Sequence, residues 1–279
     1  MDRTEQLRQF FAHLVTANAG VPAGSELEMA FASTPRENFV GPPPWRIFTP
    51  RGYIETTSDD PSYLYQDVVV SLGTQAPLNN GQPTLHAYCI YTLGLKKGEH
   101  VLHIGAGSGY YTTILAKLVG ETGMVDAYEI EPELAQRASA NLAAFPQVRV
   151  HARSGTVAPL PACDAIYVNA GATEPLAVWL DALKPQGRLL FPLTASSGGG
   201  AMLLVTRQDE DAYAARFLMQ VSFVPCMGAR DEAIAEKLDK AFRNRNWSRN
   251  WSRVKSLHRN NDPDRSCWFA GKGWWLSTN

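Results

Sequence analysis

The sequence predicts an α/β fold with a doubly wound, mainly parallel sheet of seven strands, preceded by a helical cap and followed by a C-terminal extension. The first observation behind this prediction is that short apolar runs alternate with segments of helical periodicity between residues 86 and 194, as in βαβ units. The second is a glycine-rich turn directly after one of these runs. The third is a pair of later apolar runs, at 202–208 and 215–224, which predict antiparallel strands at the sheet edge.

The N-terminal part is expected to form the helical cap and a long loop. Residues 4–18 place their apolar side chains on one helical face, and a second, short helix is expected from Glu26 to about Ala32. Residues 51–83 are irregular and rich in turn residues. A loop of this length is typically functional or forms a small cap.

The central part is expected to hold the parallel strands and their connecting helices. Gly94 ends one of these helices, and Pro132 begins another, because the missing N–H of proline costs nothing in a first turn. In chain order we expect a helix at 86–94, a strand at 100–104, a helix at 110–119, a strand at 124–130, a helix from 132, strands at 148–152 and 164–170, a helix at 175–183 and a strand at 188–194.

The composition is that of a globular protein with a substantial core, because 45% of the 279 residues are hydrophobic and 19% are charged. The formal net charge of -1 gives no field that would attract nucleic acid or an anionic membrane. No apolar run approaches the roughly 20 residues that span a bilayer, and the N-terminus lacks the pattern of a signal peptide. The four cysteines and the histidines show no metal-ligand spacing. A cytoplasmic protein with reduced thiols, no metal and no membrane partner is therefore expected.

The glycine-rich turn reads Gly-Ala-Gly-Ser-Gly over 105–109, between an expected strand and an expected helix. Glycines let the backbone turn tightly and let a ligand approach, and the helix that follows offers free N–H groups. Glu129 ends the next strand, where a carboxylate can accept hydrogen bonds from both hydroxyls of a ribose. The pattern favours an adenosyl ligand without phosphates. A nicotinamide dinucleotide and a purely structural turn remain alternatives, although the turn has neither the GxGxxG spacing nor a P-loop lysine.

Several segments of the chain resemble, in order, the protein-L-isoaspartate O-methyltransferase family over roughly residues 5–228. That family belongs to the Rossmann-like class I methyltransferases, and the resemblance implies S-adenosyl-L-methionine as cofactor. The segments are MAFASTPRENFVGP (29–42), GQPTLHAY (81–88), VLHIGAGSGYYTTILA (101–116), VDAYEIEPELAQRA (125–138), DAIYVNAGATEP (164–175), LKPQGRLLFPL (183–193) and FVP (223–225).

The resemblance also implies which residues form the site. The loop from Asn80 would close over the methionine end of the cofactor, Ser154 and Gly155 would lie at the adenine, and Cys226 would lie behind the substrate. The residues expected to bind the cofactor are Gln82, His86, Gly105, Gly107, Ser108, Gly109, Glu129, Ser154 and Gly155, and those expected at the transferred methyl group are Asn80, Gly81 and Asn169.

Three positions depart from the family pattern. Gly81 replaces a usual serine, which removes a hydroxyl from the transfer site. His103 replaces an acidic residue in the strand before the glycines, and Ser154 replaces an aspartate. An uncharged serine can still accept a hydrogen bond from an adenine amino group, but more weakly.

Methyl transfer to a carboxylate needs no general base, because the nucleophile is already ionised; the enzyme aligns oxygen and methyl and excludes water. We expect O-methylation of a carboxylate, with an isoaspartyl or aspartyl peptide as the first candidate. The expected donors that orient it are backbone N–H groups of residues 79–83, Asn169 and Thr173. The alternatives are another acceptor, such as a modified peptide or a small metabolite, and a non-catalytic relative that binds the cofactor or nucleic acid.

Two histidines have competing interpretations. His86 either closes over the cofactor or is a core residue that caps its own helix. His103 lies in an apolar strand and is expected to be a hydrogen-bonded core histidine. Its charge would change near neutral pH if it reached the site instead.

The C-terminal extension combines basic residues with tryptophans. Residues 229–245 are expected to be helical, and the repeat RNWSRNWSR covers 245–253. A solvated helix face, with the tryptophans packed on the main domain, is favoured over nucleic-acid binding. An aromatic lid over the substrate, made of Trp268, Trp274 and Trp275, and a homodimer contact are further options. The expected division is 1–85 for the cap and substrate loop, 86–228 for the methyltransferase domain and 229–279 for the extension.

Overall fold

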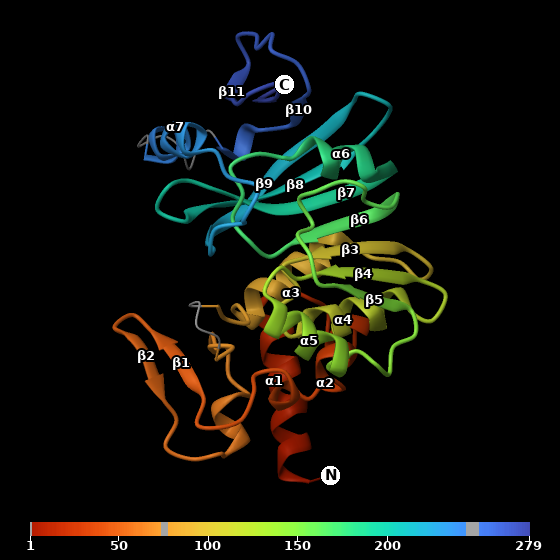
Figure 1. Cartoon of the computed structure of the whole chain (residues 1–279), viewed down its shortest axis with the longest axis vertical. Helices are drawn as coiled ribbons and strands as arrows, with labels where there is room; N and C mark the ends of the chain where they lie inside the picture. Colours follow the sequence, from red (N-terminus) through yellow and green to blue (C-terminus); the bar gives the residue numbers. More distant parts are fainter. Residues whose placement is uncertain (1, 74–77, 244–250) are drawn as a thin grey trace. The chain divides into compact units, whose positions relative to one another are not determined.

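The computed structural model describes residues 2–73, 78–243 and 251–279, and the chain forms two compact units (Figure 1). Unit 1 contains residues 1–99 and 106–153, and unit 2 contains residues 100–105 and 154–279. The boundary between the units therefore falls inside the glycine-rich turn. The division of the sequence into cap, central domain and extension stays a prediction.

The N-terminal helices of unit 1 form where the sequence predicts them. Helix α1 (Arg3–Asn18) and helix α2 (Glu26–Ala32) pack on each other and bury Phe11, Val15, Leu27 and Phe31, whereas Phe10 is 65% exposed. The Asp2 and Ser25 side chains accept hydrogen bonds from first-turn N–H groups, which stabilises both helix starts. Helix α1 also packs against α3 (Pro83–Leu93), and α2 packs against α4 (Tyr110–Val119).

The βα pattern of unit 1 follows the sequence prediction as well. Strand β4 (Met124–Tyr128) pairs in parallel with β5 (Val148–His151). Helix α4 packs on β4, and α5 (Pro132–Asn141) packs on β5. Pro132 begins α5 as predicted, and Gly94 ends α3 in the left-handed conformation at φ 61°.

The long segment between α2 and α3 is a small sheet with two single helical turns, η1 (Arg36–Asn38) and η2 (Pro61–Tyr63). Strands β1 (Arg46–Thr49) and β2 (Gly52–Glu55) form an antiparallel hairpin. The other side of β1 hydrogen-bonds to residues 69–71, and Ser71 forms a bridge with Asn79. Backbone hydrogen bonds therefore connect the hairpin to residues 69–71 and connect these residues to 79 and 80. This part of the chain was expected to be irregular.

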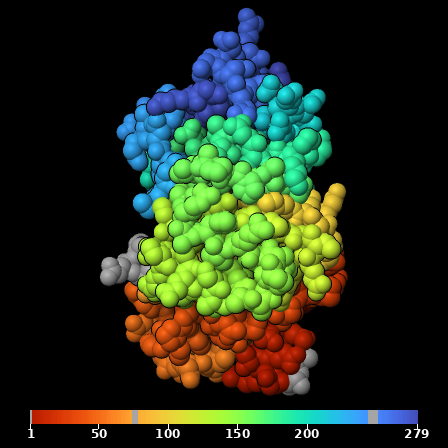
Figure 2. All heavy atoms as spheres, turned by 45° about the vertical axis from the view of Figure 1, so that its right-hand side comes forward, coloured from red at the N-terminus to blue at the C-terminus, as the bar shows by residue number. Residues whose placement is uncertain are grey.

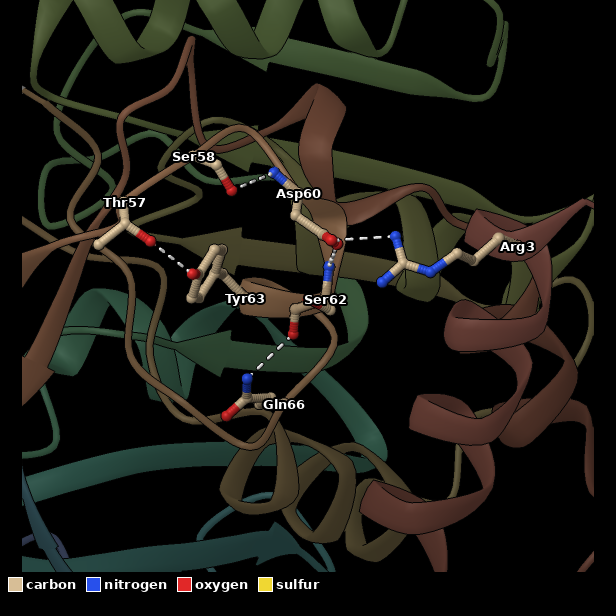
Figure 3. A network of polar contacts seen from close by, with 7 residues as sticks. All are labelled: Arg3, Thr57, Ser58, Asp60, Ser62, Tyr63 and Gln66. Atoms are coloured by element: carbon tan, nitrogen blue, oxygen red, sulfur yellow. Dashed lines mark hydrogen bonds and ion pairs between the residues drawn. The ribbon is translucent and has the colours of Figure 1, made fainter.

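A polar network fixes the turn at η2 (Figure 3). The Asp60 carboxylate accepts a hydrogen bond from the Ser62 N–H at 2.9 Å and pairs with the Arg3 guanidinium of α1 at 3.0 Å. The Thr57 and Tyr63 hydroxyls lie 2.7 Å apart. The Ser62 N–H and Arg3 together lower the pKa of Asp60. Because the pair is exposed, its role is to orient the turn and not to add much stability.

Unit 2 contains the rest of the parallel strands and the predicted antiparallel edge. Strand β3 (His100–Ile104) pairs in parallel with β6 (Cys163–Val168), which pairs in parallel with β7 (Leu183–Thr194). Helix α6 (Ala177–Ala182) packs on β7. Strands β8 (Gly199–Arg207) and β9 (Tyr213–Ser222) continue the sheet in antiparallel order, as predicted.

The C-terminal residues add strands that were not predicted from the sequence, so the predicted total of seven strands is too low. After α7 (Glu232–Arg243) and a turn η3 (Trp251–Arg253), strand β10 (Ser256–His258) pairs with β9. Strand β12 (Trp275–Ser277) then pairs with β10, and β11 (Cys267–Ala270) pairs with β12.

Two of the C-terminal tryptophans are buried in unit 2, which supports the favoured packing of this segment and disfavours the aromatic lid. Trp274 and Trp275 are each 4% exposed, and the Trp268 ring centroid lies 5.0 Å from that of Phe217 on β9. In Figure 2 the cyan to blue residues of this unit form one continuous surface. The first part of the RNWSRNWSR repeat, with Arg245, Trp247 and Arg249, lies outside the described residues.

Within the part of the chain that the structure describes, every helix is too short or too polar to cross a membrane.

The buried strands of the C-terminal residues lead to a stability prediction. Leu276 on β12 is fully buried between Leu257 and Phe269 of its neighbouring strands. Leu276→Ala is expected to lower the free energy of unfolding by about 2–5 kcal/mol, because it leaves a cavity in the core. Urea unfolding followed by tryptophan fluorescence measures this, with the exposed Asp262→Ala as control. A change as small as that of the control would mean that these strands are an appendage.

Candidate functional site

The glycine-rich turn requires its glycines at two positions of unit 1. Gly107 and Gly109 have φ angles of 58° and 94°, a left-handed conformation that residues with a Cβ rarely adopt. A Cβ at 109 would lie 2.9 Å from Cδ1 of Leu142, and one at 107 would lie 3.3 Å from Cδ1 of Leu72. The Ser108 carbonyl accepts a hydrogen bond from the Asn141 amide at 2.9 Å. The turn is therefore closely packed by the helix behind it and the loop in front of it.

Glu129 lies beside this turn, in the same unit, and its carboxylate is 6% exposed. One oxygen accepts a hydrogen bond from the Gly107 N–H at 2.7 Å, and the other accepts one from the Glu131 N–H at 2.9 Å. Burial raises the pKa of Glu129, and these backbone N–H groups oppose that rise. The Ile130 N–H also donates to this carboxylate. A carboxylate has about four acceptor positions, so about one remains for a further donor. This arrangement fits a ribose hydroxyl and disfavours a phosphate, whose charge it would repel.

His86 and Gly81 are in direct contact in unit 1. His86 is 2% exposed, and its ring stacks on Tyr111 of α4 with centroids 3.8 Å apart. Gly81 has a φ of 70°, and a Cβ there would lie 2.1 Å from Nε2 of His86. No side chain fits at position 81 while His86 keeps this place.

Arg36 holds the loop in front of the site. Its guanidinium is fully buried and donates hydrogen bonds to the backbone carbonyls of Leu64, Gln66 and Val68. Burial lowers the pKa of Arg36. The same guanidinium reaches the Asn80 side-chain oxygen at 3.4 Å. Arg36 lies in the segment 29–42, which resembles the family. Its role could not be predicted from the sequence, because its partners are backbone groups far along the chain.

The Asn80 amide is oriented by two donors to its oxygen, Arg36 and the Val70 N–H at 3.0 Å. Its Nδ2 is buried and has no hydrogen-bond partner among the described residues. The backbone N–H groups expected to orient a carboxylate are used within the loop: that of Asn80 donates to the Val70 carbonyl and that of Gly81 to the Asn79 side chain. The Gln82 side chain donates to Asp67 at 3.0 Å. Asn80 Nδ2 is therefore a buried donor that no described residue of the loop accepts from.

Unit 2 places Gly105 and Asn169 in contact at the carboxyl ends of β3 and β6. A Cβ on Gly105 would lie 3.5 Å from the carbonyl carbon of Asn169. The Asn169 side-chain Nδ2 lies 2.7 Å from Nε2 of His103, which is fully buried. Burial lowers the pKa of His103 to about 3, so the ring is neutral. The prediction of a hydrogen-bonded core histidine is confirmed.

The other predicted residues of unit 2 form local turns. The Ser154 hydroxyl contacts the Thr156 hydroxyl at 2.7 Å, and the Gly155 carbonyl accepts a hydrogen bond from the Trp179 indole at 2.9 Å. Cys226 is 4% exposed. The hydroxyl of Thr173 is fully engaged, since it accepts from the Asp231 N–H and donates to the Ala229 carbonyl. The Thr173 hydroxyl therefore holds Asp231 at the start of α7 and has no donor left for a substrate carboxylate.

Across the described ranges of the chain, no three His, Cys, Asp or Glu side chains are grouped so that they could hold a metal ion.

Comparison with known proteins identifies a family and several relatives that are similar to this chain. Residues 13–231 match the family model described as protein-L-isoaspartate(D-aspartate) O-methyltransferase. The protein-L-isoaspartate O-methyltransferase of Brucella anthropi is 34% identical over 192 residues, which cover 65% of this chain and 80% of the relative. The protein-L-isoaspartate O-methyltransferase 2 of Marinobacter nauticus is 35% identical over 217 residues, which cover 75% of this chain and 87% of the relative.

Two solved structures share the fold. One, a protein-L-isoaspartate O-methyltransferase, is 24% identical with a TM-score of 0.66 and covers 93% of this chain and 74% of its own. Another, from Plasmodium falciparum, is described as a beta-aspartate methyltransferase in complex with S-adenosyl-L-homocysteine. It is 18% identical with a TM-score of 0.63 and covers 79% of this chain and 98% of its own. These structures confirm the predicted Rossmann-like α/β fold.

The contact between Gly81 and His86 leads to a prediction. Gly81→Ala is expected to lower the free energy of unfolding by about 1–3 kcal/mol, because the new methyl group overlaps the imidazole. Most of this loss should disappear in the His86→Ala background, and thermal unfolding of the four proteins of this cycle measures the coupling.

Gly20→Ala is the matched control for that experiment. Gly20 has nearly the same φ, 71°, but nothing lies within 4 Å of its Cβ position. The control therefore reports the backbone cost alone. If Gly81→Ala costs no more than Gly20→Ala, the imidazole does not exclude a side chain at position 81.

Proposed function

The chain belongs to the protein-L-isoaspartate(D-aspartate) O-methyltransferase family, and from that premise we propose that it methylates the carboxyl group of isoaspartyl residues in peptides and proteins. The methyl donor is S-adenosyl-L-methionine. The observation that carries the proposal is the match over residues 13–231, which contains the glycine-rich turn, Glu129 and the loop at 79–82. A cytoplasmic location is part of the proposal, because the cysteines form no disulfide within the described residues.

The residues of unit 1 suit the adenosyl part of this cofactor. Glu129 accepts a hydrogen bond from a ribose hydroxyl through the acceptor position that Gly107, Ile130 and Glu131 leave open. The left-handed glycines keep the turn free of side chains, so that the ligand meets backbone atoms. When bound, S-adenosyl-L-methionine supplies a methyl group on a sulfonium, which is a good leaving group.

The acceptor carboxylate needs orientation and a dry surrounding, not a base. It is ionised at neutral pH, so the residues around it have to align its oxygen and exclude water. The unused Asn80 Nδ2 is suited to donate a hydrogen bond to this carboxylate. Because Arg36 and the Val70 N–H hold the Asn80 oxygen, the amide cannot turn away without losing both contacts. Asn80 thereby provides a donor next to the position where Gly81 lacks the family hydroxyl.

The role of Glu129 leads to a prediction about cofactor affinity. Glu129→Gln is expected to weaken binding of S-adenosyl-L-homocysteine by about 1–3 kcal/mol, the usual loss for a charged hydrogen-bond partner. Burial raises the pKa of Glu129, so wild-type affinity should begin to fall on acidification at a higher pH than an exposed glutamate would cause. The Gln variant should lack this fall. Calorimetry over a series of pH values from neutral downwards measures both.

The exposed Glu133→Gln is the control for this titration. An affinity that neither depends on pH in this way nor changes in the Glu129→Gln variant would remove Glu129 from the cofactor site.

The proposed reaction is tested by transfer of a labelled methyl group from S-adenosyl-L-methionine to an isoaspartyl peptide. We expect labelling of this peptide and none of the matching aspartyl peptide. Asn80→Asp should lower kcat/KM for the peptide by about 10- to 100-fold, because it replaces a donor by a negative charge. Binding of S-adenosyl-L-homocysteine should stay unchanged. Asn38→Asp, at a surface turn of the same unit, is the control.

The contrary outcome is also informative. If the wild-type protein binds the cofactor but labels neither peptide, its acceptor is another carboxylate, and panels of small carboxylic acids become the next substrates to assay.

A further inference from the structure

The hairpin β1–β2 of unit 1 carries an exposed aromatic face that the proposed function does not use. Phe48 on β1 is 52% exposed, and Tyr53 on β2 is its direct cross-strand partner. The two rings meet edge to face with their centroids 5.3 Å apart, and the Arg46 guanidinium lies 5.4 Å from the centroid of the Tyr53 ring. In Figure 1 the hairpin stands apart from helices α1 and α2 of the same unit. The three side chains therefore order one another, although half of Phe48 is still in contact with water.

Strand pairing continues this face from the hairpin to the loop at 79–82. The Phe48 N–H donates to the Val69 carbonyl at 2.9 Å, and the Ser71 N–H donates to the Arg46 carbonyl at 2.9 Å. Ser71 is in turn the bridge partner of Asn79. Paired residues of neighbouring strands share a face, and successive residues alternate between the faces. One face, here called the outer face, therefore consists of Arg46, Phe48, Tyr53, Val69, Ser71 and Asn79.

The opposite face of the same strands packs on the protein. Ile47 is the bridge partner of Val70, which is fully buried in a small core cluster. The Val70 N–H donates to the side-chain oxygen of Asn80 at 3.0 Å. Asn80 is the residue proposed above to orient the acceptor carboxylate, and Asn79 precedes it directly. The outer face therefore ends beside the proposed position of the reacting carboxylate, and all of its residues belong to unit 1.

The dimensions of the outer face suit a short peptide. Three strand spacings separate Tyr53 from Asn79, which is roughly 14 Å or about four residues of extended chain. Strands β1 and β2 have four residues each, so the whole face measures roughly 200 Å². A stable dimer interface buries about 800 Å² on each partner. The outer face is therefore too small to hold a second copy of this chain, but one extended peptide segment can cover it.

The chemistry of the outer face also suits a peptide of variable sequence. Aromatic rings supply a large contact area and lose little conformational entropy on binding, so they accept many kinds of side chain. Arg46 adds a positive charge to the face, which complements a peptide that carries a carboxylate. Isoaspartyl residues arise with different neighbours along a chain, so a contact without strict sequence demands is appropriate for them.

We propose that the outer face, with Phe48 and Tyr53 as its apolar contacts, binds the extended peptide segment on one side of the isoaspartyl residue, up to about four residues away from it. This inference rests on the proposed function, because it takes the isoaspartyl peptide from there. The hairpin acts on affinity for the peptide and not on the transfer step, because it lies away from the reacting carboxylate.

Two isoaspartyl peptides of different length test this inference. The short peptide has one residue on each side of the isoaspartate, and the long one has about six, enough to reach Tyr53. Phe48→Thr is expected to raise KM for the long peptide by about 4- to 12-fold, because half of a phenylalanine side chain is no longer covered on binding. The kcat and the KM for the short peptide should stay unchanged. Threonine keeps a high preference for strands, and Tyr53→Thr should act in the same direction.

Ile54→Thr is the matched control on the other face of the same hairpin. Ile54 is 58% exposed and pairs with Ile47, so it lies opposite to the outer face. This variant should change neither KM. Thermal unfolding of all three variants shows whether each is folded, and calorimetric titration of the long peptide into the protein loaded with S-adenosyl-L-homocysteine measures the affinity without turnover.

The outcomes separate this inference from the proposed function. If the wild-type protein labels neither peptide, the proposed function fails and the inference falls with it. If it labels both, and the folded Phe48→Thr variant leaves KM for the long peptide unchanged or raises it equally for both peptides, only the inference is overturned. Sedimentation that shows a wild-type dimer dissociated by Phe48→Thr would assign the outer face to self-association and would also overturn it.

Discussion

The buried guanidinium of Arg36 is the interaction on which the rest of unit 1 depends. Removing a charge from water costs several kcal/mol, and the Asp67 carboxylate offsets only part of this cost. Backbone carbonyls of Leu64, Gln66 and Val68 accept its hydrogen bonds, so the loop must follow one path around the side chain. The same group holds the Asn80 oxygen. Loss of Arg36 would therefore release the loop and the amide together.

The departures from the family pattern become understandable when each is considered with its neighbour. Gly81 lacks a side chain, and the His86 imidazole fills the space where a Cβ would lie. His103 replaces an acidic residue, and it accepts a hydrogen bond from the Asn169 amide. In both places a histidine and a nearby residue form a packed pair. Beside the first pair, Asn80 keeps a buried donor that has no partner among the described residues.

The C-terminal residues show how burial decides the role of an aromatic segment. On sequence, tryptophans among basic residues suit a lid, a nucleic-acid contact or a packed edge. Strand β10 pairs with β9 and β12 pairs with β10, and the side chains of Leu257, Trp274 and Leu276 are buried in unit 2. Burying large apolar side chains is worth roughly 1.5–3 kcal/mol each, which an exposed lid would forgo. The helix α7 keeps its charged side chains in solvent, as the favoured interpretation expected.

The sequence by itself determined the elements whose signals are local. Helix α4 begins and ends at the predicted residues, β3 covers the predicted strand, and Pro132 and Gly94 mark helix ends, because periodicity and caps act within one or two turns. The glycine-rich turn and Glu129 were found for the same reason. Only the tertiary structure decided that Arg36 binds carbonyls about thirty residues away, that His103 meets Asn169, and that the last strands join β9. Those contacts join residues distant in sequence, and packing of the whole unit selects them over other partners of equal local preference.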